Sequence, residues 1–144
     1  MKKPLALRPE DVGPFSKAIG LGFEKIEEGY SLGRLEVRDD LLNFNGDLHG
    51  GVIYAMADTG MGGALVPCLE RDERCTTVEI KIVYLNAVTV GTLTCETRLV
   101  HRGKRIAVLE SNVENSGRPV ARALGTYYVS KAKAKAKANA DRQS

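Results

Sequence analysis

The chain has 144 residues, enough for one domain that buries about two-thirds of its unfolded surface. Its 43% hydrophobic and 27% charged residues are typical of a soluble globular protein, and the absence of Trp with only 6% aromatic residues argues against base-stacking surfaces. The net charge of +3 arises from a Lys-rich segment after Val129, so the nearly neutral remainder excludes the broad basic face of a nucleic-acid binder.

The first third of the chain predicts one short helix and two short strands. Acidic residues followed by apolar residues with helical spacing indicate a helix over about residues 10–20, with Pro14 in its first turn. Alternating apolar residues over 21–37 predict two strands, or one bent strand, with a break at Glu28-Gly29. Residues 43–47 are predicted to form a loop.

A central helix is predicted to begin at His49 or Gly50 and to end near Pro67. Its apolar residues occur all round rather than along one stripe, which is typical of a buried helix. Residues 50–69 also have the length of a membrane span, but five glycines, one Asp and one Pro make that alternative poor. We therefore expect no contact with a membrane.

Four longer strands are predicted over residues 76–84, 91–101, 105–113 and 120–129. In the first of them, Val78, Ile80, Ile82 and Tyr84 are expected to face inward. Strands of this length joined by hairpin turns predict a long curved antiparallel sheet. The sheet and the central helix would bury each other, which gives a single α+β domain over residues 1–129.

The cysteines and the N-terminus indicate a reducing compartment. The three cysteines form no C-x-x-C pair, so neither a disulfide framework nor a metal site is expected. The first ten residues contain no apolar run long enough for a signal peptide. We expect a cytoplasmic protein that needs no metal or other cofactor and whose Lys/Ala-rich segment 130–144 is solvated.

Asp58 is the only acidic or basic side chain between His49 and Glu70. Its neighbours are apolar or small, and burying a carboxylate among them costs free energy unless it is paired. Asp58 is therefore a candidate functional group. The alternative is an ordinary Asp that is paired or solvated at the edge of the helix.

The Gly50-Gly51 pair at the start of the helix is a second candidate feature. Backbone N–H groups at a helix N-terminus lack partners within the helix, and without side chains they are open to an incoming oxygen, so they form a candidate oxyanion hole. Alternatively, the glycines only permit a tight entry into the helix. Eight residues of helix rise about 12 Å, so a site that uses both Gly50 and Asp58 would require a second copy of the helix across a two-fold axis.

Polar side chains accompany these two features. They are Asn43, Asn45, Asp47 and His49 before the helix, and Thr76 and Thr77 on the next strand. Each also has an ordinary structural interpretation: the Asn and Asp residues as helix caps, His49 as a partner of backbone groups, and Thr77 as a common strand residue. No single one of them indicates a function.

The spacing N-x-x-G-x-x-H-G-G-x-x-x-x-x-x-D, followed by T-V-E-I-K-I-V-Y-L and a strand-turn-strand with R-G-K, resembles the hotdog-fold acyl-CoA thioesterases of the PaaI-like group. The similarity extends over roughly residues 20–129. It implies a hotdog fold, in which a long antiparallel sheet wraps around the central helix. It also implies a homodimer, often assembled into a homotetramer, with an acyl-CoA as substrate.

The resemblance implies roles for single residues. The Gly50 N–H would polarise the thioester carbonyl, and Asp58 of the partner subunit would act on it as a general base for water or as a nucleophile. Asn43 would hold the water or the carbonyl, Thr77 would orient the water, and His49 would support the loop beside the carbonyl. Such chemistry suits a thioester, because its leaving group is good and it needs only a placed water, a base and donors for the oxyanion.

Other residues are expected to contact the substrate. The phosphates of coenzyme A call for basic groups, and Arg102, Lys104 and Arg105 are the candidates, although they also suit a solvated charged hairpin. Gly51 at the helix start is expected to contact the substrate, and Tyr54 and Met61 are candidates for lining the acyl pocket.

Two further functions suit the same fold. Acyl-thioester dehydratases use a His and a carboxylate as an acid–base pair, but the spacing of His49 and Asp58 looks more like that of the thioesterases. A non-enzymatic acyl-CoA binder or sensor would keep the pocket and the dimer without needing Asp58. The sequence does not indicate the acyl group.

Overall fold

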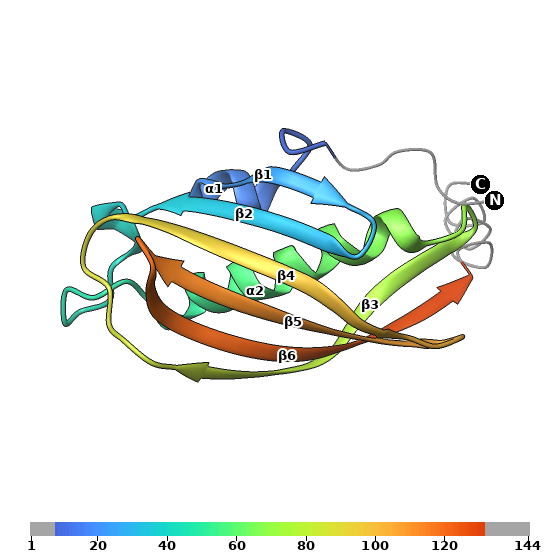
Figure 1. The fold of residues 1–144 in the computed structure, drawn as a ribbon. Coiled ribbons are helices and arrows are strands. Elements are labelled where there is room, and N and C mark those ends of the chain that lie inside the picture. The colour runs from blue at the N-terminus through green and yellow to red at the C-terminus, as the bar shows by residue number, and fades with distance from the viewer. Residues whose placement is uncertain (1–7, 132–144) are drawn as a thin grey trace, which may run out of the picture.

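The structure is a computed structural model that describes residues 8–131 (Figure 1). Most of the predicted solvated segment therefore lies outside the described residues. The helices and strands are α1 (Pro14–Ile19), β1 (Leu21–Glu27), β2 (Tyr30–Glu36), α2 (Gly50–Leu65), β3 (Glu73–Tyr84), β4 (Thr92–Arg102), β5 (Ile106–Asn115) and β6 (Arg118–Lys131), with short 3-10 helices at Asp39–Leu41 and Val66–Cys68.

The strands form one antiparallel sheet in the order β1-β2-β4-β5-β6-β3, so β1 and β3 are its edges. Residues in the left-handed region close the hairpins: Gly29 (φ 76°) between β1 and β2, and Ser116 and Gly117 (φ 52° and 82°) between β5 and β6. The sheet curves around α2 (Figure 1). The predicted curved antiparallel sheet around one central helix is confirmed, as is the break at Gly29 between the first two strands.

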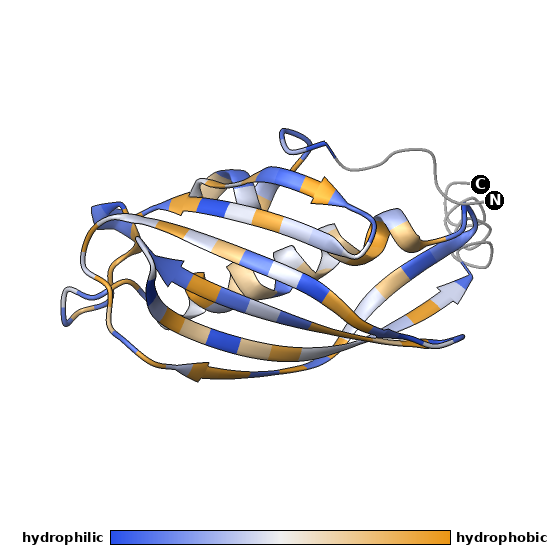
Figure 2. Ribbon diagram, viewed as in Figure 1, coloured by the Kyte–Doolittle hydropathy of each residue, from blue (hydrophilic) through white to orange (hydrophobic). Residues whose placement is uncertain are grey.

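The core lies between α2 and the sheet. Figure 2 shows hydrophobic and hydrophilic bands alternating along β4, β5 and β6, as expected for strands with one face toward a core. The largest fully buried apolar side chains are Leu35, Met56, Met61, Leu65, Leu69, Leu93, Leu109, Val113, Val120 and Val129. They come from both the helix and the sheet, so each element depends on the other for its burial.

Glycines allow α2 to lie very close to the sheet. A Cβ atom added to Gly60 would lie 2.6 Å from Thr97 Oγ1, and one added to Gly63 would lie 2.8 Å from the ring of Phe23. Both distances are shorter than van der Waals contact. These two positions of the helix therefore accept no side chain unless the sheet moves.

Hydroxyl groups of the sheet also hydrogen-bond to the carbonyls of α2. Ser31 Oγ donates to the carbonyl of Gly60 (2.7 Å), and Ser111 Oγ donates to that of Ala57 (3.3 Å). Thr97 Oγ1 lies 2.7 Å from Ser111 Oγ and completes this buried group. Helical carbonyls have a second lone pair for such bonds, and bonds from a fixed strand hold the helix at one rotation about its axis.

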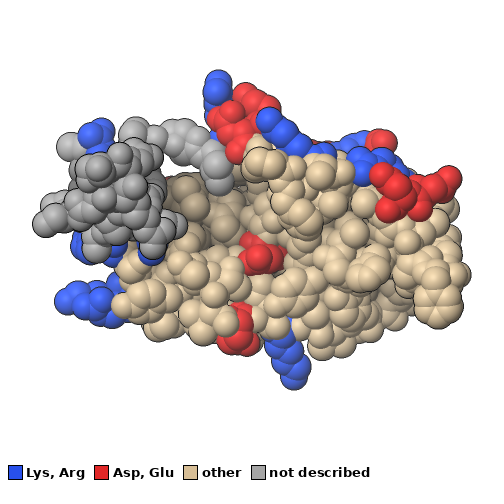
Figure 3. Space-filling model, turned by 180° about the vertical axis from the view of Figure 1, so that it is seen from behind, with Lys and Arg blue, Asp and Glu red and all other residues tan. Residues whose placement is uncertain are grey.

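The other side of α2 is not covered by the sheet. Partly exposed residues recur three and four positions apart along it: Gly51, Tyr54, Ala55, Asp58, Thr59 and Gly62. Apart from Asp58, these residues are uncharged. Figure 3 shows the molecule from behind, with a broad uncharged area and isolated acidic groups in its middle. The prediction that this helix is buried all round is thus wrong for the single chain, because one sheet covers only one side.

A β-bulge breaks the alternation in β3. The pairing with β6 shifts between Thr77 and Glu79, which leaves Val78 as an extra residue. Val78 is 57% exposed and Tyr84 is 48% exposed, while the two isoleucines between them are half-buried. The prediction that Val78 faces inward is wrong, because a strict period of two fails at an inserted residue. Tyr84 lies on the same face as the two isoleucines, as predicted, and contacts α2, but it remains partly exposed at the end of an edge strand.

The first helix is shorter than the predicted 10–20 range. It begins at Pro14, and Glu10 and Asp11 precede it instead of forming its first turn. Asp11 pairs with Arg8 at 3.0 Å, outside the helix. Within the part of the chain that the structure describes, no helix is long and apolar enough to cross a membrane.

Candidate active site

The start of α2 presents one open backbone N–H. His49 is the N-cap, and its Nδ1 accepts a hydrogen bond from the N–H of Gly51 (2.8 Å). The Gly51 N–H is therefore occupied. No described residue accepts the N–H of Gly50, which leaves this donor available at the positive end of the helix dipole.

A cleft of about 320 Å³ opens beside Gly50. Tyr84 at the end of β3 forms part of its wall, and its hydroxyl donates to the carbonyl of Gly50 (2.8 Å). A Cβ added to Gly50 would lie 3.3 Å from the Tyr84 ring, so the glycine keeps this entrance clear. The apolar side chains Ile53, Leu85 and Val88 line the same cleft.

Asn43 holds the loop that forms the opposite wall of this cleft. Its Oδ1 accepts hydrogen bonds from the backbone N–H groups of Asn45 (2.9 Å) and Asp47 (3.1 Å). This is the side-chain turn typical of Asn, and it occupies the carbonyl oxygen. The Asn43 side chain lines the cleft with Gly50, as predicted for a shared site, and its Nδ2 donates to no group among residues 8–131.

Asp58 lies in the middle of α2 and is held by two hydroxyl groups. Thr77 Oγ1 on β3 donates to Asp58 Oδ1 (2.8 Å). The hydroxyl of Tyr127 on β6 also donates to Oδ1 and lies 2.7 Å from the backbone carbonyl of the same Asp. Asp58 is half-buried, so its carboxyl group is neither enclosed in the core nor fully in solvent.

Tyr127, which contacts Asp58, is a residue of the candidate site that the sequence analysis missed. It is only 4% exposed, and burial, followed by its hydrogen bond to Asp58, raises its pKa far above the usual 10.0. Its inward position on the last predicted strand is visible in the alternation of that strand. A tyrosine at a buried position needs a partner for its hydroxyl, which was the available signal.

Gly50 and Asp58 remain apart within one chain. They are eight residues apart on the same helix, which corresponds to about 12 Å. Their neighbours on β3 are separated too, since Tyr84 contacts Gly50 and Thr77 contacts Asp58. One chain therefore carries the open backbone N–H of Gly50 at one place and the carboxylate of Asp58 at another, as the sequence predicted.

Tyr54 and Met61, the two predicted pocket residues of the helix, occupy different environments. Tyr54 is half-buried on the partly exposed side, with its hydroxyl 3.5 Å from the carbonyl of Ile80. Met61 is fully buried against Gly125 of β6. Met61 therefore belongs to the core of the chain rather than to the surface of a cleft.

The three basic residues predicted to bind coenzyme A are divided between two arrangements. Arg102 pairs with Glu73 (3.3 Å) and donates to the carbonyls of the following turn. Lys104 and Arg105 instead line an open cleft of about 230 Å³, to which Lys131 also contributes. Two of the predicted residues thus share a basic cleft, and Arg102 supports the turn that carries them.

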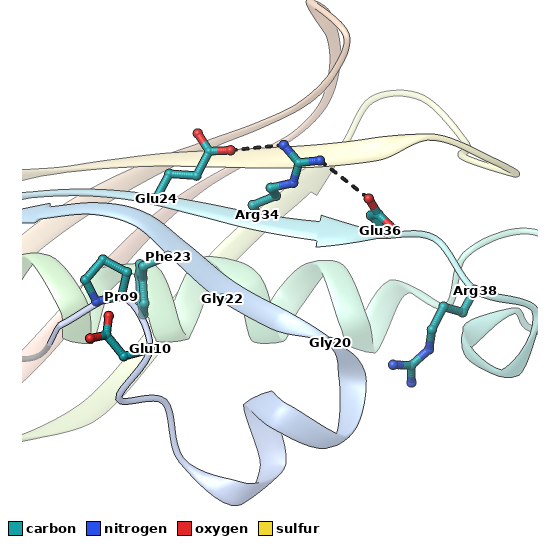
Figure 4. Close-up of a pocket in the computed structure, with 9 residues that line it drawn as sticks. All are labelled: Pro9, Glu10, Gly20, Gly22, Phe23, Glu24, Arg34, Glu36 and Arg38. Carbon is teal, nitrogen blue, oxygen red and sulfur yellow. Dashed lines mark hydrogen bonds and ion pairs between the residues drawn. The ribbon is translucent and has the colours of Figure 1, made fainter.

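A wider hollow of about 500 Å³ lies elsewhere, between the N-terminal segment and the first hairpin (Figure 4). Its guanidinium groups already have carboxylate partners: Arg34 pairs with Glu24 (3.1 Å) and Glu36 (3.4 Å), and Arg38 pairs with Asp40 (3.0 Å). Its lining residues include neither Gly50 nor Asp58. This hollow therefore does not belong to the candidate site.

No group of three His, Cys, Asp or Glu side chains within residues 8–131 is arranged to hold a metal ion. The described cysteines form no disulfide bond with one another. The chemistry available at the site is thus that of a carboxylate, hydroxyl groups and an open backbone N–H.

Comparisons with known proteins give a consistent result. Residues 45–122 match the family model of the thioesterase superfamily. A Saccharolobus solfataricus protein, SSO1253, with a provisional esterase name is 35% identical over 124 residues, which covers 85% of this chain and 80% of that protein. The acyl-coenzyme A thioesterase PaaI of Escherichia coli is 27% identical over 101 residues, covering 69% of this chain and 70% of its own.

Solved structures agree with this similarity. The conserved protein PA5202 of Pseudomonas aeruginosa superposes with a TM-score of 0.80 at 31% identity, covering 83% of this chain and 95% of that one. The matched region contains Gly50, Asp58 and Thr77, whereas Tyr127 lies beyond the residues of the family match. The predicted hotdog architecture of the PaaI-like group is confirmed.

Proposed function

The chain belongs to the thioesterase superfamily, and on that premise we propose that it hydrolyses an acyl-CoA thioester to a free acid and coenzyme A. One observation carries the proposal: a half-buried carboxylate, Asp58, is anchored through one oxygen by two hydroxyl groups. An Asp held in this way keeps its other oxygen for a reaction partner. The E. coli relative is named an acyl-coenzyme A thioesterase, which supports coenzyme A as the leaving group.

Gly50 supplies the hydrogen-bond donor that stabilises the oxyanion in the proposed site. The thioester carbonyl accepts a hydrogen bond from the open Gly50 N–H, and the negative charge that develops on this oxygen is stabilised at the helix N-terminus. Loss of one such donor in an enzyme typically costs about 100- to 1,000-fold in kcat. The Nδ2 of Asn43, from the same cleft, is the second donor for the carbonyl or for the water. His49 fixes the backbone at the start of α2 through its hydrogen bond from the Gly51 N–H.

A two-fold dimer joins the two halves in this proposal. β3 is an edge strand, and an exposed edge with apolar side chains is prone to pair with another chain. Val78, Val83 and Tyr84 on this strand are exposed. Pairing of two β3 edges about a two-fold axis sets two α2 helices antiparallel, so the Gly50 end of one helix faces Asp58 of the partner subunit.

The proposed chemistry balances without any cofactor. The oxygen of water attacks the carbonyl carbon, Asp58 takes the proton, and collapse of the tetrahedral intermediate breaks the C–S bond. The thiolate of coenzyme A leaves and receives the proton that Asp58 took, which restores the carboxylate. Thr77 has given its hydrogen to Asp58, so its lone pairs are left to accept a hydrogen bond from the attacking water.

The second version of the chemistry uses Asp58 as a nucleophile. The carboxylate attacks the carbonyl carbon and the C–S bond breaks, so that the thiolate of coenzyme A leaves and a mixed anhydride forms. Water then hydrolyses this anhydride to the free acid and the Asp58 carboxylate. Both versions need the same carboxylate and the same Gly50 donor. The two versions differ in whether an oxygen atom of water can enter the Asp58 carboxylate, which isotope labelling detects.

The phosphates of coenzyme A are assigned to Lys104 and Arg105, which line an open cleft together with Glu73 and Lys131. This cleft lies between the turn after β4 and the paired ends of β3 and β6.

Two neighbouring cations are already engaged. Arg102 pairs with Glu73 and Lys131 pairs with Asp72 (3.2 Å), so we expect both to support the cleft rather than to bind a phosphate. The acyl group is assigned to the cleft beside Gly50, against the apolar side chains of Ile53, Leu85 and Val88.

The test is release of free coenzyme A, followed with a thiol reagent, for a panel of aryl, medium-chain and long-chain acyl-CoA substrates. Asp58→Ala should lose about 1,000-fold or more in kcat while it still binds acyl-CoA. Asp11→Ala is a matched control, because this Asp lies on the surface and pairs only with Arg8. If no thioester is cleaved faster by the wild type than by Asp58→Ala, the proposal fails.

The same experiment separates the alternatives. A non-enzymatic acyl-CoA binder would bind the substrate and release no thiol, with or without Asp58. A dehydratase would change the acyl chain and keep the thioester intact, which mass spectrometry of the products detects.

A further inference from the structure

Tyr127 and Thr77 approach Asp58 from two neighbouring strands. The two residues are directly paired in the register of β3 and β6, so their side chains lie on the same face of the sheet. Both hydroxyl groups donate to the same oxygen, Oδ1. No residue among 8–131 donates to Oδ2 of Asp58.

We propose that Tyr127 is a positioning residue, which together with Thr77 fixes Oδ1 of Asp58 and thereby selects Oδ2 as the oxygen that meets water or substrate. This inference rests on the function proposed above. A carboxylate oxygen has two lone pairs in the carboxylate plane, so two O–H donors saturate Oδ1. The carboxylate can no longer rotate freely, and its two oxygens are no longer equivalent.

Tyr127 is suited to this role because it cannot move. Its ring is buried in the cluster that includes Ala57, Met61 and Leu109. Its hydroxyl contacts both the carboxylate and the backbone carbonyl of Asp58. Tyr127 therefore restrains the helix backbone at this residue as well as its side chain. Thr77, in contrast, is exposed, and its hydroxyl remains accessible to water.

Tyr127 also remains a donor at every pH at which an ordinary hydrolase acts. Burial and the neighbouring carboxylate raise its pKa, so the hydroxyl keeps its hydrogen. The groups that face it are Asp58 from α2 and, from β3, Thr77 and Cys75.

The test is Tyr127→Phe, which keeps the ring and removes the hydroxyl. We expect kcat to fall about 10- to 100-fold, the loss expected for one hydrogen bond to a charged group, with little change in KM. We also expect the acid limb of the pH dependence of kcat to move to higher pH, because the variant lacks the donor that Tyr127 supplies to Oδ1. A purely structural role for Tyr127 would lower kcat without moving this limb.

Tyr30→Phe is the matched control. Tyr30 also donates its hydroxyl to a carboxylate, that of Glu96 (3.1 Å), but on β2 and away from the site. It should leave kcat and the acid limb unchanged. In addition, Tyr127→Phe combined with Asp58→Asn should be no slower than Asp58→Asn alone, because Tyr127 acts through Asp58.

The outcomes distinguish this inference from the proposed function. If Asp58→Asn is inactive and Tyr127→Phe leaves the acid limb in place, the positioning role is overturned and the thioesterase function stands. If Asp58→Asn is as active as the wild type, both fail. Should Tyr127→Phe not fold, Tyr127→3-fluorotyrosine decides: this stronger donor should move the acid limb to lower pH, and an unmoved limb would overturn the proposal.

Discussion

Gly60 of α2 lies so close to Thr97 of β4 that a single methyl group on the glycine would come within 2.6 Å of the threonine hydroxyl oxygen. Thr97 cannot easily yield, because it is fully buried and its hydroxyl is hydrogen-bonded to that of Ser111. The contact fixes the depth at which the helix sits on the sheet. The position of Asp58, two residues earlier, follows from it.

We expect Gly60→Ala to destabilise the protein by about 1–3 kcal/mol, because overpacking forces the helix away from the sheet. Gly62→Ala is the matched control, since a Cβ at Gly62 meets no atom within 4 Å. The control should raise the free energy of unfolding by about 0.5–1 kcal/mol through helix propensity. Urea unfolding of both variants at one protein concentration measures this, and equal effects of the two would contradict the close packing.

Mixing two inactive variants should restore activity if the site is shared between protomers. Asp58→Asn removes the carboxylate, and Gly50→Pro removes the open N–H at a helix position where proline is tolerated. A random mixture of refolded dimers should recover about a quarter of the wild-type activity, because half of the dimers are mixed and each has one intact site. Mixing Asp58→Asn with Asp58→Ala should recover nothing. No recovery in the first mixture would mean that both groups act within one chain.

Single-turnover hydrolysis in H₂¹⁸O, with the enzyme in excess, distinguishes the two roles of Asp58. A nucleophilic Asp58 receives the new oxygen when the anhydride is hydrolysed at its own carboxyl carbon, whereas a general base leaves the label in the acid product. Because Oδ1 is held by two hydroxyls and Thr77 can still accept from water, we expect a general base. Mass spectrometry of the peptide that contains Asp58 detects the label, and its labelling would contradict this expectation.

Lys104→Ala should raise KM for acyl-CoA several-fold and leave kcat little changed. The cleft residue would contact only the phosphates of the substrate, which take no part in the reaction. The effect should disappear with the acyl-pantetheine substrate, which lacks the nucleotide, and should shrink at high salt. Lys25→Ala is the control, since Lys25 pairs with Glu27 on the surface (3.0 Å). If Lys104→Ala raises KM equally for acyl-pantetheine, the cleft does not bind the phosphates of coenzyme A.

Stability should decrease at alkaline pH partly because of Cys95. Burial raises the pKa of this thiol from 9.0 to about 11, so between these values the unfolded chain loses the proton that the folded chain keeps. The unfolded state then binds fewer protons, and the free energy of unfolding decreases as pH rises, by at most about 3 kcal/mol. Cys95→Ser should reduce this slope in urea unfolding between about pH 8 and pH 11. Above pH 10, Tyr127 also lowers the free energy of unfolding, to the same extent in the wild type and in Cys95→Ser. If the free energy of unfolding depends on pH in the same way in both proteins, Cys95 does not titrate in this window.

The sequence was sufficient for the elements that depend on local chemistry. The break at Gly29 and the start of α2 at Gly50 were predicted because turns and helix starts follow from glycine and from polar residues close by in the chain. The placement of Asn43 near Gly50, and of Thr77 near Asp58, was predicted from the resemblance of their spacing to that of the PaaI-like thioesterases. The distance between Gly50 and Asp58 followed from helix geometry alone.

The contacts that depend on strand register could not be predicted. Tyr127 reaches Asp58 across 69 residues of sequence, and only the pairing of β3 with β6 brings them together. The bulge at Val78 has no signature in the alternation of apolar residues, yet it decides which side chains remain exposed. Met61 was misjudged for a related reason, because Gly125 on a distant strand provides the space that buries it.

The hydroxyl groups of Ser31 and Ser111 hold the middle of α2 from the sheet, while the acyl group is assigned to the cleft at the start of this helix. The orientation of the helix therefore does not depend on the residues that touch the substrate. Exposed cleft residues such as Leu85 can be exchanged to suit different acyl groups while the carboxyl group of Asp58 keeps its direction. Because different residues orient the helix and contact the acyl group, proteins with this fold can differ in substrate range through changes in the cleft alone.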